Sequence, residues 1–184
     1  MMPYQFLRDI IEEHQPTGWA IEFGVWSGQS LAIIAEHMPV IGLDSFEGLP
    51  EDWRPEFPKG SFGPSSATIE YAPDNAMLVT GWFENTLTKL TDRGMPPIGL
   101  VHIDCDLYSS TKTALYGMLD YIDVGTIIVF DEYHGYEGYQ QHEAKAWAEF
   151  VVENVVLHDI IGTGEQERAF RITAIGEPVR GLTS

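Results

Sequence analysis

Short, predominantly apolar runs alternate along the chain with segments in which apolar residues recur every three or four positions. The first five runs lie at 19–23, 40–44, 76–80, 98–103 and 125–130. Apolar runs of this length are typical of parallel strands that are buried on both faces. The segments between them have the spacing of helices that bury one side. The alternation predicts an α/β fold, with a mostly parallel sheet between two layers of helices.

The remaining segments complete this prediction. A helix is predicted at 4–14, within an N-terminal element of residues 1–18. Apolar stripes mark later helices at Leu31, Ile34, Ala35 and Met38, at Leu115, Met118, Leu119 and Ile122, and at Ala144, Trp147, Ala148 and Val151. The runs at 155–161 and 169–175 have no helix between them, which predicts a hairpin. We expect one domain over residues 1–184, a three-layer doubly wound sheet of seven strands with an antiparallel C-terminal edge strand.

A loop-rich segment at 45–75 separates the second and third strands. It is dense in proline, glycine and aromatic residues, among them Phe46, Trp53, Phe57 and Phe62. An irregular segment of this length is typically a lid or a binding loop. So many aromatic side chains are unusual in a solvated linker, so we expect partial packing over a crevice, either as a lid or as a structural insertion.

Carboxylates end two of the strands. Asp104 and Asp106 follow the run at 98–103, and Asp131 and Glu132 follow the run at 125–130. The carboxyl ends of parallel strands open into the crevice where such sheets bind ligands, so neighbouring strands would bring these acids together. Clustered carboxylates repel one another unless a cation holds them, and oxygen ligands favour magnesium, calcium or manganese. The pattern predicts a metal site.

A glycine-containing turn follows the first strand. Gly24 and Gly28 lie between that strand and a helix N-terminus, an arrangement in which a ligand can approach the backbone. Asp44 ends the second strand, the position from which an acid commonly accepts hydrogen bonds from ribose hydroxyls. Trp82 and Phe83 follow the third strand and are placed either to flank a purine ring or to pack in the core.

Charge and composition limit the partners. Ten Lys and Arg residues against 28 Asp and Glu give a net charge of −18, which argues against a nucleic-acid or anionic-membrane partner. The first residues lack the basic flank and apolar core of a signal peptide, and the apolar runs are too short to cross a membrane, so we expect a cytoplasmic protein. Cys105 is the only cysteine, and it is expected to be a packing residue.

Five motifs resemble the macrocin O-methyltransferase family. They are Glu22-Phe-Gly-Val-Trp-Ser-Gly-Gln-Ser30, Gly42-Leu-Asp-Ser-Phe-Glu-Gly-Leu-Pro-Glu51, Gly81-Trp-Phe-Glu-Asn-Thr-Leu87, His102-Ile-Asp-Cys-Asp-Leu-Tyr-Ser-Ser-Thr111 and Phe130-Asp-Glu-Tyr133. The family's enzymes depend on S-adenosylmethionine and magnesium, and they methylate sugar hydroxyls on macrolide and aminocoumarin antibiotics. The resemblance implies a class I methyltransferase fold and a small-molecule acceptor that carries hydroxyl groups.

The resemblance also implies roles for single residues. Glu22 and the turn at 24–28 would line the methionine part of the cofactor, Asp44 its ribose, and Trp82 with Phe83 its adenine. The full cofactor-binding set is Glu22, Gly24, Val25, Trp26, Gly28, Ser30, Asp44, Ser45, Trp82, Phe83 and Asp104. Asp104, Asp131 and Glu132 would bind magnesium, with manganese or calcium as substitutes. Asp104 and Asp106 would be the catalytic residues, with Asp106 as the general base.

Two other functions fit part of the pattern. In a metal-dependent glycosyltransferase, Asp104-Cys-Asp106 would hold a nucleotide-sugar diphosphate, although this leaves the glycine turn and Asp44 without a role. A protein that binds S-adenosylmethionine without catalysis is the second alternative. We expect an O-methyltransferase that acts on a sugar or polyhydroxylated natural product, and homo-oligomerisation stays open.

Overall fold

The computed structural model describes residues 4–63 and 73–176, which contain a seven-stranded sheet. The strand order is β3-β2-β1-β4-β5-β7-β6. The strands are β1 (Trp19–Phe23), β2 (Val40–Asp44), β3 (Ala76–Thr80), β4 (Ile98–Ile103), β5 (Ile127–Phe130), β6 (Val156–Thr163) and β7 (Arg168–Ile175). The first three strands are added toward one edge of the sheet and the next two toward the other. This change of order lies between the parallel strands β1 and β4, which is where doubly wound folds bind ligands.

The strand directions confirm the predicted sheet. β1, β2, β3, β4 and β5 pair in parallel, whereas β7 runs antiparallel to both β5 and β6. The C-terminal pair is therefore the predicted hairpin, with β7 lying between β5 and the edge strand β6.

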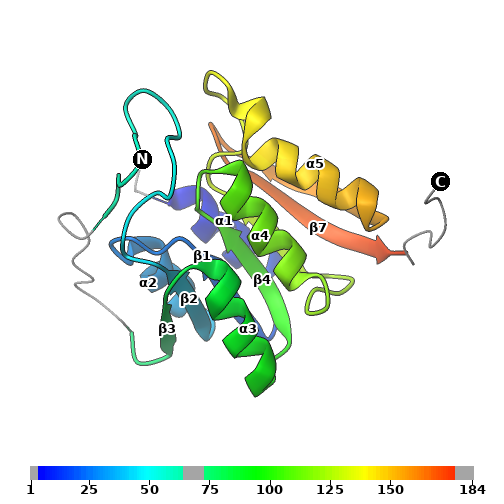
Figure 1. The fold of residues 1–184 in the computed structure, drawn as a ribbon. Coiled ribbons are helices and arrows are strands. Elements are labelled where there is room, and N and C mark those ends of the chain that lie inside the picture. The colour runs from blue at the N-terminus through cyan, green and yellow to red at the C-terminus, as the bar shows by residue number, and fades with distance from the viewer. Residues whose placement is uncertain (1–3, 64–72, 177–184) are drawn as a thin grey trace, which may run out of the picture.

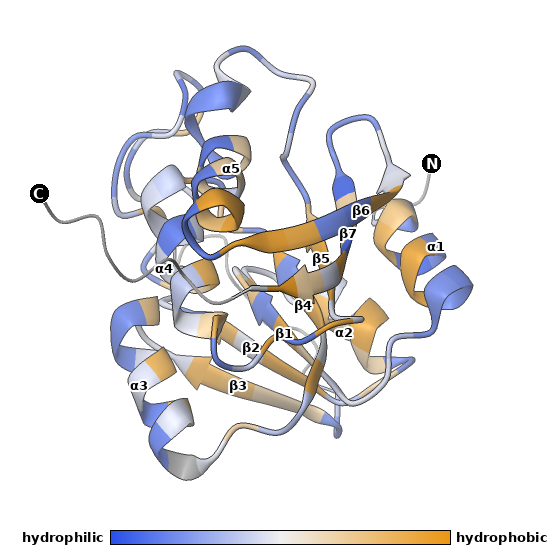
Figure 2. Cartoon of the chain, turned by 90° about the vertical axis from the view of Figure 1, so that its right-hand side faces the viewer, coloured by the Kyte–Doolittle hydropathy of each residue, from blue (hydrophilic) through white to orange (hydrophobic). Residues whose placement is uncertain are grey.

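Helices cover both faces of this sheet. They are α1 (Gln5–His14), α2 (Gln29–Ala35), α3 (Phe83–Arg93), α4 (Tyr108–Met118) and α5 (Glu143–Glu153), with a short 3₁₀ helix, η1 (Tyr139–Gln141). α3, α4 and α5 lie side by side on one face, and α1 and α2 lie on the other (Figure 1). Figure 2 shows the apolar strands enclosed between these layers. None of the helices in the described ranges is long and apolar enough to cross a membrane.

Side-chain alternation along β4 separates the two halves of the core. Val101 and Ile103 pack in the cluster beneath α3, α4 and α5, whereas Leu100 packs with residues of α1 and α2. Successive side chains of a strand point to opposite faces, so His102 shares the face of Leu100. A polar residue within this apolar strand is thereby buried beneath α1.

Two helices differ in detail from the sequence prediction. The apolar stripe predicted for α4 runs to Ile122, whereas the helix spans Tyr108–Met118 and ends before Leu119. On α5, Trp147 is buried as expected, but its buried neighbours are Ala146 and Phe150, while Ala148 is exposed. The apolar pattern around Trp147 fits two stripes that differ by one residue, and the larger Phe150 side chain decides between them by packing on Trp147 and Tyr116.

The loop-rich segment packs against the sheet end as expected for its described part, residues 45–63. It rises from the same end of the sheet as the segment that precedes α5 (Figure 1). Leu49 and Trp53 are buried together with Leu107, and the Trp53 ring lies 5.8 Å from that of Tyr136. Residues 64–72 of the predicted segment lie outside the described ranges.

Candidate active site

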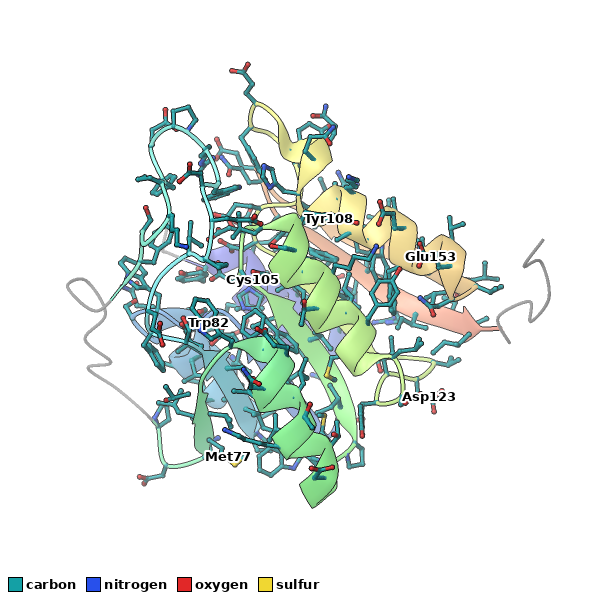
Figure 3. All side chains as sticks on the ribbon, viewed as in Figure 1. Met77, Trp82, Cys105, Tyr108, Asp123 and Glu153 are labelled. Atoms are coloured by element: carbon teal, nitrogen blue, oxygen red, sulfur yellow. The ribbon has the colours of Figure 1, made fainter. Side chains whose placement is uncertain are left out.

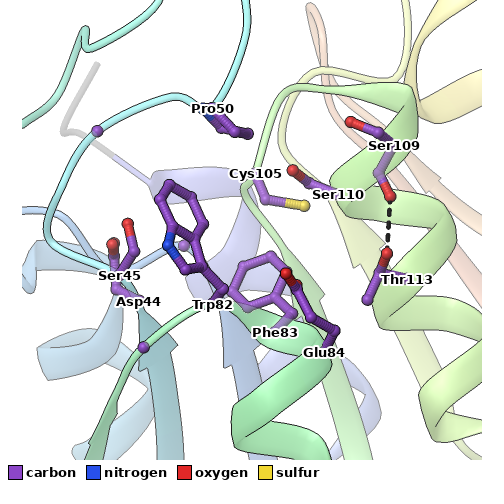
Figure 4. Close-up of a pocket in the computed structure, with 13 residues that line it drawn as sticks. Asp44, Ser45, Pro50, Trp82, Phe83, Glu84, Cys105, Ser109, Ser110 and Thr113 are labelled. Carbon is purple, nitrogen blue, oxygen red and sulfur yellow. Dashed lines mark hydrogen bonds between the residues drawn. The ribbon is translucent and has the colours of Figure 1, made fainter.

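Two adjoining cavities lie at the carboxyl ends of the parallel strands. The larger of these two has a volume of about 440 Å³. Its lining comes from four places in the chain: Gly24, then Asp44, Ser45, Gly48 and Pro50, then Gly81, Trp82, Phe83 and Glu84, and then Cys105, Ser109, Ser110 and Thr113. Trp82 stands between the side of Asp44 and Ser45 and the side formed by Cys105 and α4 (Figure 4). A cavity of this size, with two aromatic rings and several polar side chains in its lining, suits a small organic cofactor.

The residues at this end of the sheet are far apart in the sequence. Trp82 follows β3 and Cys105 follows β4, yet both line the same cavity. Met77 in β3 and Asp123, which precedes β5, mark the opposite end of the sheet (Figure 3). The cavity therefore lies at the sheet edge that the sequence pattern predicted.

Asp44 organises the turn after β1. Its Oδ2 atom accepts hydrogen bonds from the backbone N–H groups of Val25 and Trp26, both at 2.8 Å. Its Oδ1 atom accepts a third, from Phe46 N–H at 2.7 Å. The carboxylate thus fixes two backbone segments and also faces both cavities. The expected ribose contact would add to this structural role.

Gly24 is required because two backbone segments of the chain approach each other closely. Its φ of +93° is in the region that favours glycine, and a Cβ atom there would lie 1.7 Å from the carbonyl oxygen of Asp104. The glycine lets the turn after β1 touch the end of β4. The sequence-based explanation for this glycine, ligand access, omitted this contact.

A second cavity of about 150 Å³ lies beside the first and contains the acids. Its lining is Tyr4, Gly24, Val25, Trp26, Asp44, Gly48, Phe62, Asp104, Asp106, Asp131 and Glu132. The two cavities share Gly24, Asp44 and Gly48. A ligand in the larger cavity can therefore lie against one in the acidic cavity with little side-chain bulk between them.

The acids form two groups that share Asp104. One carboxylate oxygen each of Asp104 and Asp131 lies with a ring nitrogen of His102, all within 4.8 Å of one another. Carboxylate oxygens of Asp104, Asp106 and Glu132 form the second group within the same limit. The structure thus brings all four predicted acids together, and it places Asp131 and Glu132 in different groups.

Burial and mutual repulsion raise the pKa of each of these acids. For Asp104 the pKa is well above its ordinary value because of burial first and then the charges of Asp131 and Glu132. Burial raises the pKa of Asp106 to about 7, partly offset by a hydrogen bond with Glu132. The pKa of Glu132 is also well above its ordinary value because of burial and the charge of Asp106, and burial raises the pKa of Asp131. A divalent cation would remove this repulsion, so the donor set fits the expected ion.

Glu143 lies behind the acids and was missed by sequence reasoning. It is the first residue of α5, fully buried, and its Oε2 atom accepts a hydrogen bond from Glu132 N–H at 3.3 Å. Burial, followed by the charges of Asp106 and Asp131, raises its pKa well above the ordinary value. A neutral Glu143 carboxyl would support the backbone of Glu132 without adding charge to the cluster.

Tyr4 is a second residue that the sequence did not indicate. It precedes α1, lines the acidic cavity, and has a pKa raised by burial and then by the charges of Asp104 and Asp131. Its hydroxyl is therefore a neutral donor beside the carboxylates. Only the docking of α1 onto the sheet brings it there.

Three of the predicted cofactor residues lie outside the described lining of both cavities. Glu22 and Ser30 are buried, and Gly28 precedes α2. Glu22 instead contacts His102, with 2.9 Å between its Oε1 atom and the Nδ1 atom of the imidazole. Gly24, Asp44, Ser45, Trp82 and Phe83 line the larger cavity, whereas Val25, Trp26 and Asp104 line the acidic one.

A parallel sheet with reversed order at β1 and β4, two C-terminal antiparallel strands and a cavity at the switch point define a Rossmann-like methyltransferase fold. The chain belongs to the methyltransferase domain family, whose sequence profile matches residues 21–133. The expectation of a methyltransferase is therefore confirmed. Among proteins of curated function, none is similar enough in sequence to count as a relative.

Solved structures share the fold at low identity. CalS11, a calicheamicin methyltransferase, is 21% identical with a TM-score of 0.71, over 90% of this chain and 77% of that one. The O-methyltransferase NovP is 19% identical with a TM-score of 0.67, over 91% of this chain and 76% of that one. MycE from the mycinamycin biosynthetic pathway, solved with Mg and SAH, is 14% identical with a TM-score of 0.57, over 91% of this chain and 48% of that one.

Proposed function

We propose that the protein is an S-adenosylmethionine-dependent O-methyltransferase that acts on a hydroxyl group of a sugar or polyhydroxylated natural product. The observation that carries this proposal is the contact between the two cavities across Gly24, Asp44 and Gly48. One cavity has the ring and polar groups suited to a nucleoside, and the other has the carboxylates suited to a cation and a proton acceptor. Methyl transfer needs these two partners in line and in contact.

In this proposal the larger cavity binds the cofactor. Trp82 and Phe83 flank the adenine, and Asp44 with Ser45 contacts the ribose. The turn that carries Gly24 and Trp26 holds the methionine part near the border of the two cavities. Because Asp44 already accepts three backbone N–H groups, it is held rigidly for this contact.

The acidic cavity binds the cation and the acceptor. Asp104, Asp131 and Glu132 are the proposed ligands of magnesium, with manganese or calcium as substitutes. When bound, the cofactor supplies the methyl group on its sulfonium, and the cation lowers the pKa of the acceptor hydroxyl. Asp106 takes the hydroxyl proton, because burial raises its pKa above the ordinary value and makes it a stronger base than an exposed carboxylate. Phe62 lines the acceptor side and belongs to the segment proposed as a cover.

The structural neighbours support this class of acceptor. CalS11 is described as a TDP-rhamnose 3'-O-methyltransferase, and MycE was solved with mycinamycin VI, Mg and SAH. The finer assignment to the macrocin O-methyltransferase family is part of the same proposal. The methyltransferase family match argues against the glycosyltransferase alternative.

Calorimetric titration with S-adenosylhomocysteine, with and without magnesium, tests the cofactor part. We expect micromolar binding that is lost in Asp44→Ala and weakened about tenfold in Trp82→Ala. The matched control is Asp52→Ala, because Asp52 is an exposed acid on the next loop that accepts only Lys59 N–H at 2.8 Å among the described residues. No binding under any of these conditions would refute the proposal.

Turnover tests the catalytic part. Methyl transfer from S-adenosylmethionine to a panel of sugars, nucleotide sugars and glycosylated natural products is expected to identify an acceptor. Asp106→Asn should bind S-adenosylhomocysteine normally and lose turnover. Full turnover in this variant would remove Asp106 as the base, whereas cofactor binding without transfer to any member of the panel would favour the non-catalytic alternative.

A further inference from the structure

His102 is held in one orientation by a buried carboxylate. It lies opposite Glu22 in the pairing of β4 with β1, and both side chains are 0% exposed. The His102 Nδ1 atom lies 2.9 Å from Glu22 Oε1. A carboxylate has only acceptor atoms, so Nδ1 carries a proton and donates it to Glu22, which leaves Nε2 as the ring nitrogen that faces another partner.

The Nε2 atom of His102 is one of the buried side-chain atoms without a partner among the described residues. It has no hydrogen bond with any residue in the described ranges, although the side chain is fully buried. A buried polar atom that stays unpaired costs about 1–3 kcal/mol, so such an atom at a functional site indicates a missing ligand. A ring nitrogen of His102 lies within 4.8 Å of oxygens of Asp104 and Asp131, so a pair of carboxylates lies next to the imidazole.

One imidazole nitrogen and two carboxylate oxygens form a donor set for a first-row transition metal. Magnesium and calcium favour all-oxygen sites, whereas manganese, iron, cobalt and zinc also accept imidazole nitrogen. The contact of Glu22 with the other ring nitrogen repeats the carboxylate–histidine–metal arrangement that orients histidine ligands in metalloproteins. Ligands of one ion lie about 3–4 Å apart, and these three groups, within 4.8 Å of one another, are close enough to share one ion after a small rearrangement.

We propose that His102, Asp104 and Asp131 form a binding site for a divalent transition metal ion, positioned by Glu22 and selective for manganese over magnesium. His102 thus takes the place of Glu132 beside the two aspartates in the ligand set given above, and manganese, given there as a substitute for magnesium, becomes the preferred ion. The inference deepens the proposed function, since the ion would serve the same acceptor. It is tested without cofactor or acceptor, so the two proposals can fail separately.

The test uses chelator-stripped protein titrated with Mn²⁺ and followed by electron paramagnetic resonance. We expect one bound ion with an affinity at least about tenfold higher than that for Mg²⁺, measured by competition. Pulsed spectra of the bound ion should show coupling to a ¹⁴N nucleus. Glu22→Gln should weaken Mn²⁺ binding about 10- to 100-fold, because it removes the charge that supports the imidazole.

The ligand variant and its control complete the experiment. His102→Asn should abolish the ¹⁴N coupling, whereas His37→Asn should leave it unchanged, because His37 lies on the surface beside Glu12. Should His102→Asn fail to fold, the wild-type spectrum and the Mn²⁺ to Mg²⁺ affinity ratio decide the question. Bound Mn²⁺ without ¹⁴N coupling, or equal affinity for the two ions, would overturn the inference. If S-adenosylhomocysteine still bound, the proposed function would survive that result.

Discussion

Asp106→Asn is expected to stabilise the metal-free protein while it abolishes turnover. Asp106 is only 7% exposed and lies among carboxylates, so its charge is unfavourable in the folded state without a cation. Asparagine has nearly the same shape and carries no charge. It also tolerates the left-handed backbone at this position, where φ is +64°. The substitution therefore removes the charge with little other disturbance.

The magnitude follows from the pKa of Asp106. The folded protein keeps this proton up to a pKa of about 7, whereas the unfolded chain loses it near the ordinary value of 3.8. The free energy of unfolding therefore falls as pH rises through this window, and the loss is complete above it. At 1.36 kcal/mol per pH unit the whole window corresponds to about 4 kcal/mol, and the part between pH 5 and the pKa to about 3 kcal/mol. The gain from Asp106→Asn should therefore be larger at pH 8 than at pH 5 by about 3 kcal/mol.

Urea unfolding in the presence of EDTA, followed by tryptophan fluorescence at pH 5 and pH 8, measures this difference. The matched control is Asp120→Asn, because Asp120 is an exposed acid just after α4. We expect no pH-dependent gain in the control. A gain for Asp106→Asn that is equal at the two pH values, or a loss of stability at pH 8, would refute the electrostatic account of this site.

Three further predictions concern the same end of the sheet. Adding Mg²⁺ or Mn²⁺ to the wild-type protein should raise the melting temperature more at pH 8 than at pH 5. The reason is that the carboxylates with raised pKa values must lose their protons before they bind an ion. An equal rise in melting temperature at the two pH values would contradict this. Gly24→Ala should destabilise the fold by more than about 3 kcal/mol because of the contact with Asp104, and an unchanged melting temperature would be inconsistent with that contact. Glu143→Leu should lower the free energy of unfolding by about 1–3 kcal/mol, because Glu132 N–H loses its acceptor. Glu143→Gln should retain most of the stability. Equal losses for the two variants in thermal unfolding would exclude this role for the hydrogen bond.

The acids at the strand ends could be predicted because a local pattern in the sequence combines with a general property of parallel sheets. Asp44, Asp104 and Asp131 each end an apolar run, and all strands of a parallel sheet end at the same edge. Consecutive strands of a sheet usually pair, which made β4 and β5 the expected neighbours. For this reason the sheet and the meeting of the acids followed from sequence.

Other parts of the site depend on packing that leaves no local pattern. An acid such as Glu143 in the first turn of a helix is usually exposed and stabilised by the helix dipole, and only the docking of α5 buries it. Tyr4 reaches the acids only because α1 packs beneath the sheet. Glu22 and His102 did carry a signal, since each is a polar residue inside an apolar run, and such residues need a buried partner.

The border between the two cavities has a consequence for how such an enzyme diversifies. Gly24 and Gly48 contribute backbone to the border, and a Cβ atom at Gly48 would lie 2.6 Å from the carbonyl oxygens of Gly60 and Ser61. Substitutions that reshape one compartment therefore have almost no shared side chain through which to disturb the other. With the two cavities assigned as proposed, acceptor preference can change during evolution while the donor half is inherited intact, and Asp44 is the one shared side chain at which both halves would change together.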